Sequence, residues 1–239
     1  TEMNTFLNLC EVFLEDGFMY AILAMGYYIS YTILDFPDLT VEGTVLTGGA
    51  IFAILIKAGL HPWLALFVAF IVGAAIGCLT GFLHVKLKIR PLLCGILVST
   101  SLITVNLVVT VLGMGGTLAG EGQTTIPIGR GLSTVLRVFP ATLLPENVGG
   151  VNIRKLVTFF LIAVLFKLLL DLYLKTKSGM MLRATGSNSH YTTSMAQNPD
   201  KYKVIGLAIG NAYAAVSGAL IVQSRGNVNQ GMGIGMIVI

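Results

Sequence analysis

The sequence predicts an all-α polytopic membrane protein, built as an inverted-repeat transmembrane helical bundle with broken helices. Three observations predict this class. The 239 residues are 55% hydrophobic and only 11% charged, whereas soluble domains carry about 25% charged residues. Most of the apolar runs approach or exceed the length of about 20 residues with which a helix crosses a bilayer. They are continuously apolar rather than alternating, which disfavours a membrane β-barrel.

The apolar runs give the expected spans in chain order. They are Gly17–Leu34, a shorter Val45–Ala58, Pro62–Val85, Pro91–Leu112, Leu156–Leu174 and Val204–Val222. Acidic residues before Gly17 argue against a cleavable signal, and we expect residues 1–16 to form a short interfacial helix. A seventh run begins near Met232 and is still apolar at Ile239, which predicts that the chain is incomplete at the C-terminus.

Residues 204–239 resemble a second copy of residues 16–51. In each copy a helix-length apolar run meets a polar break, and one constant shift aligns both runs and places Gly43 on Gly231. Many transporters use duplicated halves with interrupted helices to place a pathway at the bilayer midplane. Any two membrane helices followed by loops also look alike at this level, so that alternative stays open.

Lys and Arg residues orient the expected spans. They gather in two short loops, around Lys88 and within residues 175–203, and short basic loops face the cytoplasm. The N-terminus is then outside, the Asp35–Gly43 break lies in the inner half, and the two copies enter the membrane in opposite senses. Within one domain, 1–239, this gives first-half spans in 1–112, an extracellular loop at 113–153 and second-half spans in 154–239.

Glycines and charges inside the spans favour structural roles. Gly73, Gly77 and Gly81 recur every four residues, so they line one helix face and permit close helix packing. Lys167 and Asp171 are spaced i, i+4. We expect a structural ion pair there rather than a proton relay, because no further ionisable residue continues the line.

Polar residues inside the spans and in the breaks are candidates for a translocation path. Side chains such as Thr100, Ser101 and Ser217 are expected to bond across helices. The two breaks are expected to meet near the midplane, while the first-break side chains have an alternative role as caps of the following helix. The candidate path residues are Asp38, Thr40, Glu42, Gly43, Asn106, Asn211, Asn227 and Asn229.

Catalytic and metal-binding patterns are absent from the sequence. It has no G-x-x-x-x-G-K-[ST] phosphate loop, and its three histidines and three cysteines lack metal spacing. Its basic residues lie in loops without aromatic interleaving, which argues against nucleic-acid binding. We therefore expect a non-catalytic chain that holds no metal or cofactor.

The second basic loop, residues 175–203, predicts a short helix between two spans. Ser187 or Asn188 would cap it, and it would run to about Gln197 before Pro199 enforces its end. A short helix in this place suits a lever for an external motor protein.

This loop resembles the coupling segment of permease subunits from ATP-binding-cassette importers of the branched-chain amino acid and ribose permease superfamily. The likeness is greatest to putative tryptophan and tyrosine permeases. It rests on Leu34–Gly43, Gly81–Leu93, Leu182–Asn188 and Gly231–Ile239. The chain departs from the pattern at Ala196, where glycine is frequent, and at Arg90, where an apolar residue or proline is common.

The resemblance implies a permease subunit in a bacterial cell (inner) membrane. Its partners would be a second permease copy, commonly identical, a cytoplasmic ATPase that binds ATP and Mg, and an extracellular or periplasmic substrate-binding protein. The favoured cargo is an aromatic or other apolar amino acid. An ion-coupled secondary transporter remains the alternative, and a membrane scaffold is weaker. Coupling is assigned to Leu182, Arg183, Ala184, Thr185, Gly186, Ser187 and Asn188, with Gly186 expected in a backbone conformation closed to bulkier residues.

Overall fold

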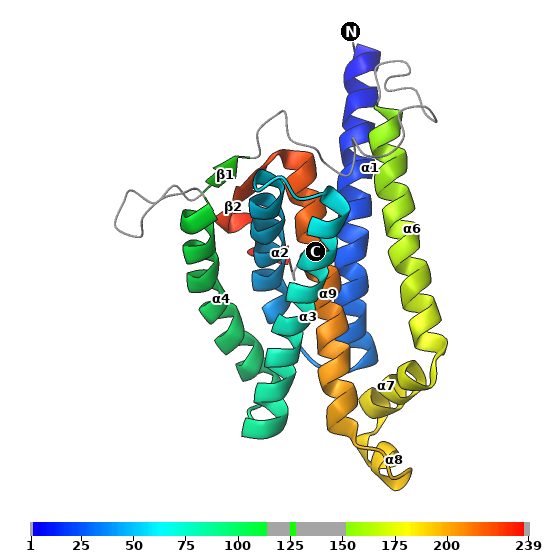
Figure 1. Cartoon of the computed structure of the whole chain (residues 1–239). Helices are drawn as coiled ribbons and strands as arrows, with labels where there is room; N and C mark the ends of the chain where they lie inside the picture. The colour runs from blue at the N-terminus through cyan, green and yellow to red at the C-terminus, as the bar shows by residue number, and fades with distance from the viewer. Residues whose placement is uncertain (1, 114–124, 128–151, 237–239) are drawn as a thin grey trace.

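The computed structural model describes residues 2–113, 125–127 and 152–236, and these form a bundle of helices (Figure 1). The all-α polytopic class predicted from the sequence is confirmed. In order, the elements are α1 (Glu2–Tyr27), the π-helix η1 (Tyr28–Ile33), α2 (Thr40–Lys57), α3 (Pro62–Leu87), α4 (Pro91–Gly113), β1 (Thr125–Pro127), α6 (Ile153–Lys175), α7 (Lys177–Ser187), α8 (Ser189–Ser194), α9 (Pro199–Arg225), β2 (Asn227–Asn229) and the 3-10 helix η2 (Gln230–Gly233).

Five described helices, α2, α3, α4, α6 and α9, are long and apolar enough to cross a membrane. Four of them extend the corresponding apolar run at one or both ends, and α2 begins five residues before its run and ends one residue before the end of it. The capping that sets both ends is clearest on α9. On α9 the Asn198 side chain accepts a hydrogen bond from the Asp200 amide at 2.9 Å. At its other end Gly226 adopts a left-handed φ of 71°, which suits glycine at a helix terminus.

The prediction of a separate interfacial helix over residues 1–16 is wrong. One helix, α1, runs from Glu2 to Tyr27 and continues as η1. The acidic residues do not interrupt it because they bind the start of α6. Glu15 pairs with Lys155, and the Asn152 amide donates to Glu11 at 3.1 Å.

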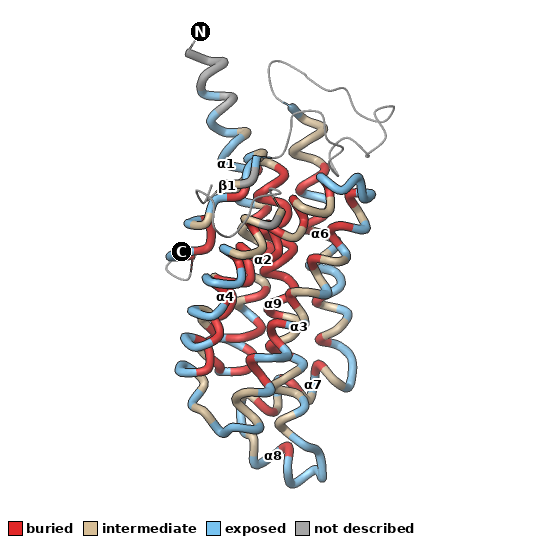
Figure 2. Tube along the Cα trace, turned by 60° about the vertical axis from the view of Figure 1, so that its left-hand side comes forward, coloured by how far each residue is buried: buried red, intermediate tan, exposed pale blue. Residues whose placement is uncertain are grey.

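The core of the bundle is built around α2 and α9. Their most apolar windows are 67% and 78% buried, compared with 33% for α3 and 28% for each of α4 and α6. Figure 2 shows the buried residues concentrated along these central helices, with exposed positions on the outer helices. The outer helices present apolar side chains, which is the expected surface for helices that face lipid.

The predicted glycine seam is confirmed as helix packing between α3 and α9. A Cβ at Gly73 would lie 2.5 Å from the Asn211 carbonyl oxygen, and one at Gly77 would collide with the Leu207 carbonyl oxygen. One at Gly81 would lie 2.9 Å from the Cα of Val204. The absent side chains therefore let the two backbones touch.

α1 and α9 run in opposite directions, as predicted for the two copies. Ser217 near the outer end of α9 donates to the Met19 carbonyl at 2.8 Å, whereas the Gly206 backbone nearer its start lies beside Leu34. The segments that follow differ in detail. The first break shrinks to residues 35–39 because α2 already begins at Thr40, while the second becomes β2 and η2. Met232 belongs to η2, so no seventh helix begins there within the described residues.

A short strand pair is the element that the sequence did not predict. Strand β1 pairs antiparallel with β2, with Thr125 opposite Asn229 and Pro127 opposite Asn227. It ties the expected extracellular loop to the end of α9. The rest of that loop, residues 114–124 and 128–151, lies outside the described residues.

The two basic loops lie at the same end of the bundle (Figure 1), because α3 ends there, α9 begins there, and α7 and α8 lie there.

This shared end allows a test of the membrane topology in a variant of the protein without native cysteines. Single cysteines at Lys88 and Lys175 should resist an impermeant thiol reagent in intact cells, whereas His61→Cys at the opposite end should react. Rapid labelling of the first two from outside would reverse the orientation. A cysteine at Gly122, outside the described residues, should also react.

Candidate functional site

The first polar break is shaped by the π-helix that precedes it. The Phe36 amide donates to the Ser30 carbonyl at 2.9 Å, and Leu34 donates to Ile29 at 3.0 Å. Asp35 then adopts a φ of 52°, a left-handed conformation that non-glycine residues seldom take inside a helix. The chain therefore turns sharply here and restarts as α2.

Asp38 is the centre of a buried polar cluster. Its Oδ1 accepts the Thr40 amide at 2.9 Å, and its Oδ2 accepts a hydrogen bond from Asn211 Nδ2 at 2.7 Å. Thr40 Oγ1 also contacts Asp38, and Thr44 Oγ1 donates to Asn211 Oδ1 at 2.7 Å. Asp38, Thr40, Thr44 and Asn211 are all fully buried. The cluster joins the start of α2 to the middle of α9. Asp38 accepts the first amide of α2, that of Thr40, from the position before Leu39, the N-cap residue, whose side chain makes no capping bond.

A second polar cluster joins α2 to α4. Asn106 Nδ2 donates to the Gly43 carbonyl at 3.1 Å, and Thr47 Oγ1 donates to Asn106 Oδ1 at 2.7 Å. Thr100 and Ser101 instead bond carbonyls of their own helix. The expected bonding across helices therefore holds for Asn106 but not for these two residues.

Together the two clusters fix how α2 sits against its neighbours. Buried polar groups are costly unless hydrogen-bonded, and at membrane depth water cannot replace a lost partner. The structure brings together Asp38, Thr40, Gly43, Asn106 and Asn211, five of the sequence candidates. Thr44 and Thr47 were missed, although their spacing from Thr40 (i+4, i+7) on one helix face was a usable signal.

The remaining candidates lie elsewhere. Glu42 is partly buried in the first turn of α2, and Gly233 of η2 packs against its carbonyl. Asn227 and Asn229 are exposed on β2, where Asn229 Oδ1 accepts the Gly231 amide at 3.0 Å. The second break therefore touches α2 through η2, but its asparagines do not join the Asp38 cluster.

The coupling segment is two helices rather than one. Asn188 Oδ1 accepts the His190 amide at 2.9 Å and so caps α8, as predicted. The residues before it, however, form α7, and α8 ends at Ser194, earlier than expected. Ala196 follows with a φ of 57°, and this left-handed backbone explains why glycine suits the position.

Gly186 is a packing position, so the expected reason for glycine there is wrong. Its φ is not in the left-handed region, and an added Cβ would collide with the Ile33 carbonyl oxygen. The next residue, Leu34, packs at Gly206 beside Leu182 of α7. Helix α7 thus rests directly on the residues that lead into the first break.

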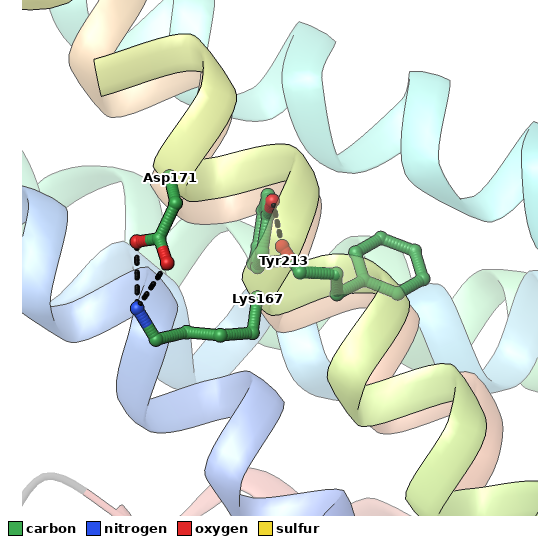
Figure 3. Close-up of polar contacts among 4 residues, drawn as sticks. Lys167, Asp171 and Tyr213 are labelled. Atoms are coloured by element: carbon green, nitrogen blue, oxygen red, sulfur yellow. Dashed lines mark hydrogen bonds and ion pairs between the residues drawn. The ribbon is translucent and has the colours of Figure 1, made fainter. Parts of the chain in front are cut away.

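Lys167 and Asp171 form the ion pair predicted from their spacing. Lys167 Nζ lies 2.6 and 2.7 Å from the two carboxylate oxygens of Asp171, and the two side chains point toward one another along α6 (Figure 3). Nearby, the Tyr213 hydroxyl donates to the Phe166 carbonyl at 2.9 Å and ties α9 to α6. Among the described residues, the side chains of Lys167 and Asp171 hydrogen-bond only to each other, which fits a structural role.

Comparison with known proteins identifies the family of the chain. The family model for the permease component of the branched-chain amino acid transport system matches residues 10–239. The chain belongs to this family. The permease is similar to a tyrosine transport system permease protein of Clostridioides difficile, with 34% identity over 95% of this chain and 68% of the relative.

Two further relatives extend the comparison. An uncharacterized protein of Rickettsia prowazekii is 30% identical over 97% of this permease and 74% of the relative. A probable branched-chain amino acid transport permease protein, LivH, of Methanocaldococcus jannaschii is 27% identical over 88% and 66%. No solved structure matches the chain. Family and helices together make this permease a multi-pass protein of the cell membrane.

Proposed function

We propose that the permease forms the translocation path of an ATP-driven importer for an amino acid with an aromatic or other apolar side chain. Two supports for the substrate class are the tyrosine permease of Clostridioides difficile and the branched-chain amino acid permease of Methanocaldococcus jannaschii. The chain forms the translocation path and transmits the motion of the ATPase to it. A cytoplasmic ATPase, which binds ATP and Mg, supplies the energy.

The contact of Gly186 with Ile33 carries the coupling part of the proposal. Helices α7 and α8 lie together at the basic end of the bundle (Figure 1), where Arg183 is exposed and available to a partner. Because α7 rests on the backbone before the break, a push on α7 is passed to Leu34. Four residues further on, Asp38 holds α2 against α9.

The proposed cycle follows from this connection. ATP binding closes two ATPase subunits against the coupling helices of two permease copies, commonly identical. Moving α7 shifts η1 and the break, and the packed core responds between discrete arrangements rather than by continuous deformation. An extracellular or periplasmic binding protein delivers the amino acid to the open path.

Reconstitution tests the proposal. Liposomes that contain the full permease and its copurifying ATPase should hydrolyse ATP faster when an amino-acid-loaded binding protein is added. Stimulation by a sugar-loaded protein alone would contradict the substrate class. Uptake driven by an ion gradient without any ATPase would instead support the secondary-transport alternative.

Gly186→Val is expected to uncouple transport. The added side chain forces α7 away from Ile33, so loaded binding protein should no longer stimulate ATP hydrolysis, while the permease still assembles in the membrane. Gly17→Val is the matched control, because an added Cβ there meets nothing within 4 Å. Parent-like stimulation in the Gly186 variant would remove the coupling assignment.

A further inference from the structure

Helix α1 and its π-helical continuation carry a stripe of tyrosines along one face. Tyr20, Ala24, Tyr27 and Tyr31 follow the spacing i, i+4, i+7, i+11, which places residues on one side of a helix. Together with Met236 from the end of the described chain, part of this stripe lines an open cavity of about 290 Å³. The lining residues are Tyr20, Ala21, Leu23, Ala24, Tyr27 and Met236.

The Tyr27 hydroxyl is buried and has no hydrogen-bond partner in the described structure. Buried polar atoms are nearly always paired in folded proteins, so each exception needs an explanation. Its ring packs edge-on against Tyr31 with centroids 5.8 Å apart. The hydroxyl is thus held in place beside the cavity while its own hydrogen-bonding capacity is unused.

The cavity lies on a face of α1 where Ala24 is exposed, and Tyr27 lies at the level of the middle of α9. At Tyr20 the hydroxyl accepts a hydrogen bond from Arg225 Nη2 at 3.1 Å. Gly26, the neighbour of Tyr27, packs against Gly210 near the middle of α9. Glu42, in the first turn of α2, acts electrostatically on both Tyr27 and Tyr31, and it is partly buried. A carboxylate at such depth faces water or protein rather than hydrocarbon.

We propose that the cavity is a transit site for the amino acid, which rests on the function proposed above. The ammonium group of the substrate would lie toward Glu42 and the tyrosine ring faces, both of which attract cations. The Tyr27 hydroxyl would bond the substrate carboxylate. Leu23 and Met236 supply an apolar surface for the side chain. A sugar is disfavoured because the wall offers few polar groups for its many hydroxyls.

Cysteine accessibility tests whether the face is wet and whether it binds an amino acid. In the full permease without native cysteines, Ala24→Cys should react with a charged thiol reagent at least on the order of tenfold faster than Ala75→Cys, because the reactive thiolate forms in water. Both positions are exposed on long helices of the bundle, but Ala75 lies on α3 away from the cavity. L-Tyrosine or L-leucine should slow labelling of Ala24→Cys, and glucose should not.

Each labelling outcome either supports or contradicts the proposed transit site. Equal, slow labelling at both positions would overturn the aqueous path. Fast labelling that amino acids do not slow, or that glucose slows, would overturn the ligand assignment. The proposed function is tested separately, by ATP hydrolysis with the unmodified permease. The transit site can therefore be contradicted while the proposed function holds, and the reverse.

Tyr27→Phe isolates the hydroxyl. Because that oxygen has no partner among the described residues, the variant should be at least as thermally stable as the parent, yet amino-acid uptake should fall several-fold through a raised KM. Tyr28→Phe is the matched control, since Tyr28 does not line the cavity. Unchanged KM in Tyr27→Phe would overturn the role of the hydroxyl.

Discussion

Gly77→Leu is expected to destabilise the bundle strongly. At this position any side chain meets the Leu207 backbone rather than a movable side chain, so α3 must separate from α9. Overpacking a core costs about 1–3 kcal/mol and occasionally more, and a backbone collision belongs at the upper end of that range. Folded yield and thermal midpoint in one detergent measure the loss.

The glycine seam also predicts which alanine substitutions should lower the stability of the bundle most, and it offers a control position. Alanine substitutions should destabilise most at Gly77, less at Gly73, where an added Cβ lies 2.5 Å from a carbonyl oxygen, and least at Gly81, where the nearest atom is at 2.9 Å. Ala75→Leu on the exposed face of the same helix should be nearly neutral. A larger loss at Gly81 than at Gly77 would contradict the packing account.

Asn211→Leu is expected to produce the second large effect. It removes the amide that donates to Asp38 at 2.7 Å and leaves a fully buried carboxylate with Thr40 as its remaining partner in the described structure. Removing the partner of a buried hydrogen-bonding group costs about 1–3 kcal/mol, and more when that group is charged. Thermal unfolding of the purified permease in detergent should show this loss, together with strongly reduced uptake.

A double-mutant cycle separates the contribution of the Asp38–Asn211 hydrogen bond to stability from other destabilising effects of the substitutions. Asp38→Leu alone should cost about 1–3 kcal/mol, because it leaves one buried N–H of the Asn211 amide without its acceptor, while the other still donates to the Leu207 carbonyl at 3.0 Å. The double variant should be clearly more stable than the sum of the single losses predicts, since residues in one network are coupled. Strict additivity would mean that the Asp38–Asn211 contact contributes little. Ser101→Ala, which removes a bond within one helix, is the control.

Several features were predictable because their signals are local. Apolar runs located α3, α4, α6 and α9 to within a few residues, since length and composition suffice to identify a spanning helix. The glycine spacing identified a packing face, and Asn188 was identified as a cap. The N-terminal helix was mispredicted because its acidic residues suggested a separate segment, and only the start of α6, far away in sequence, explains how they are accommodated.

The sequence by itself determined the class of the protein, its spanning helices and the residues from which a path could be built. Only the tertiary structure decided which of those residues meet. Asn211 joins Asp38 while Asn227 does not, Gly186 lies against Ile33, and the Tyr27 hydroxyl has no hydrogen-bond partner among the described residues. The physical reason is that composition and periodicity report the environment of one helix face, whereas pairing depends on the register between helices that are distant along the chain.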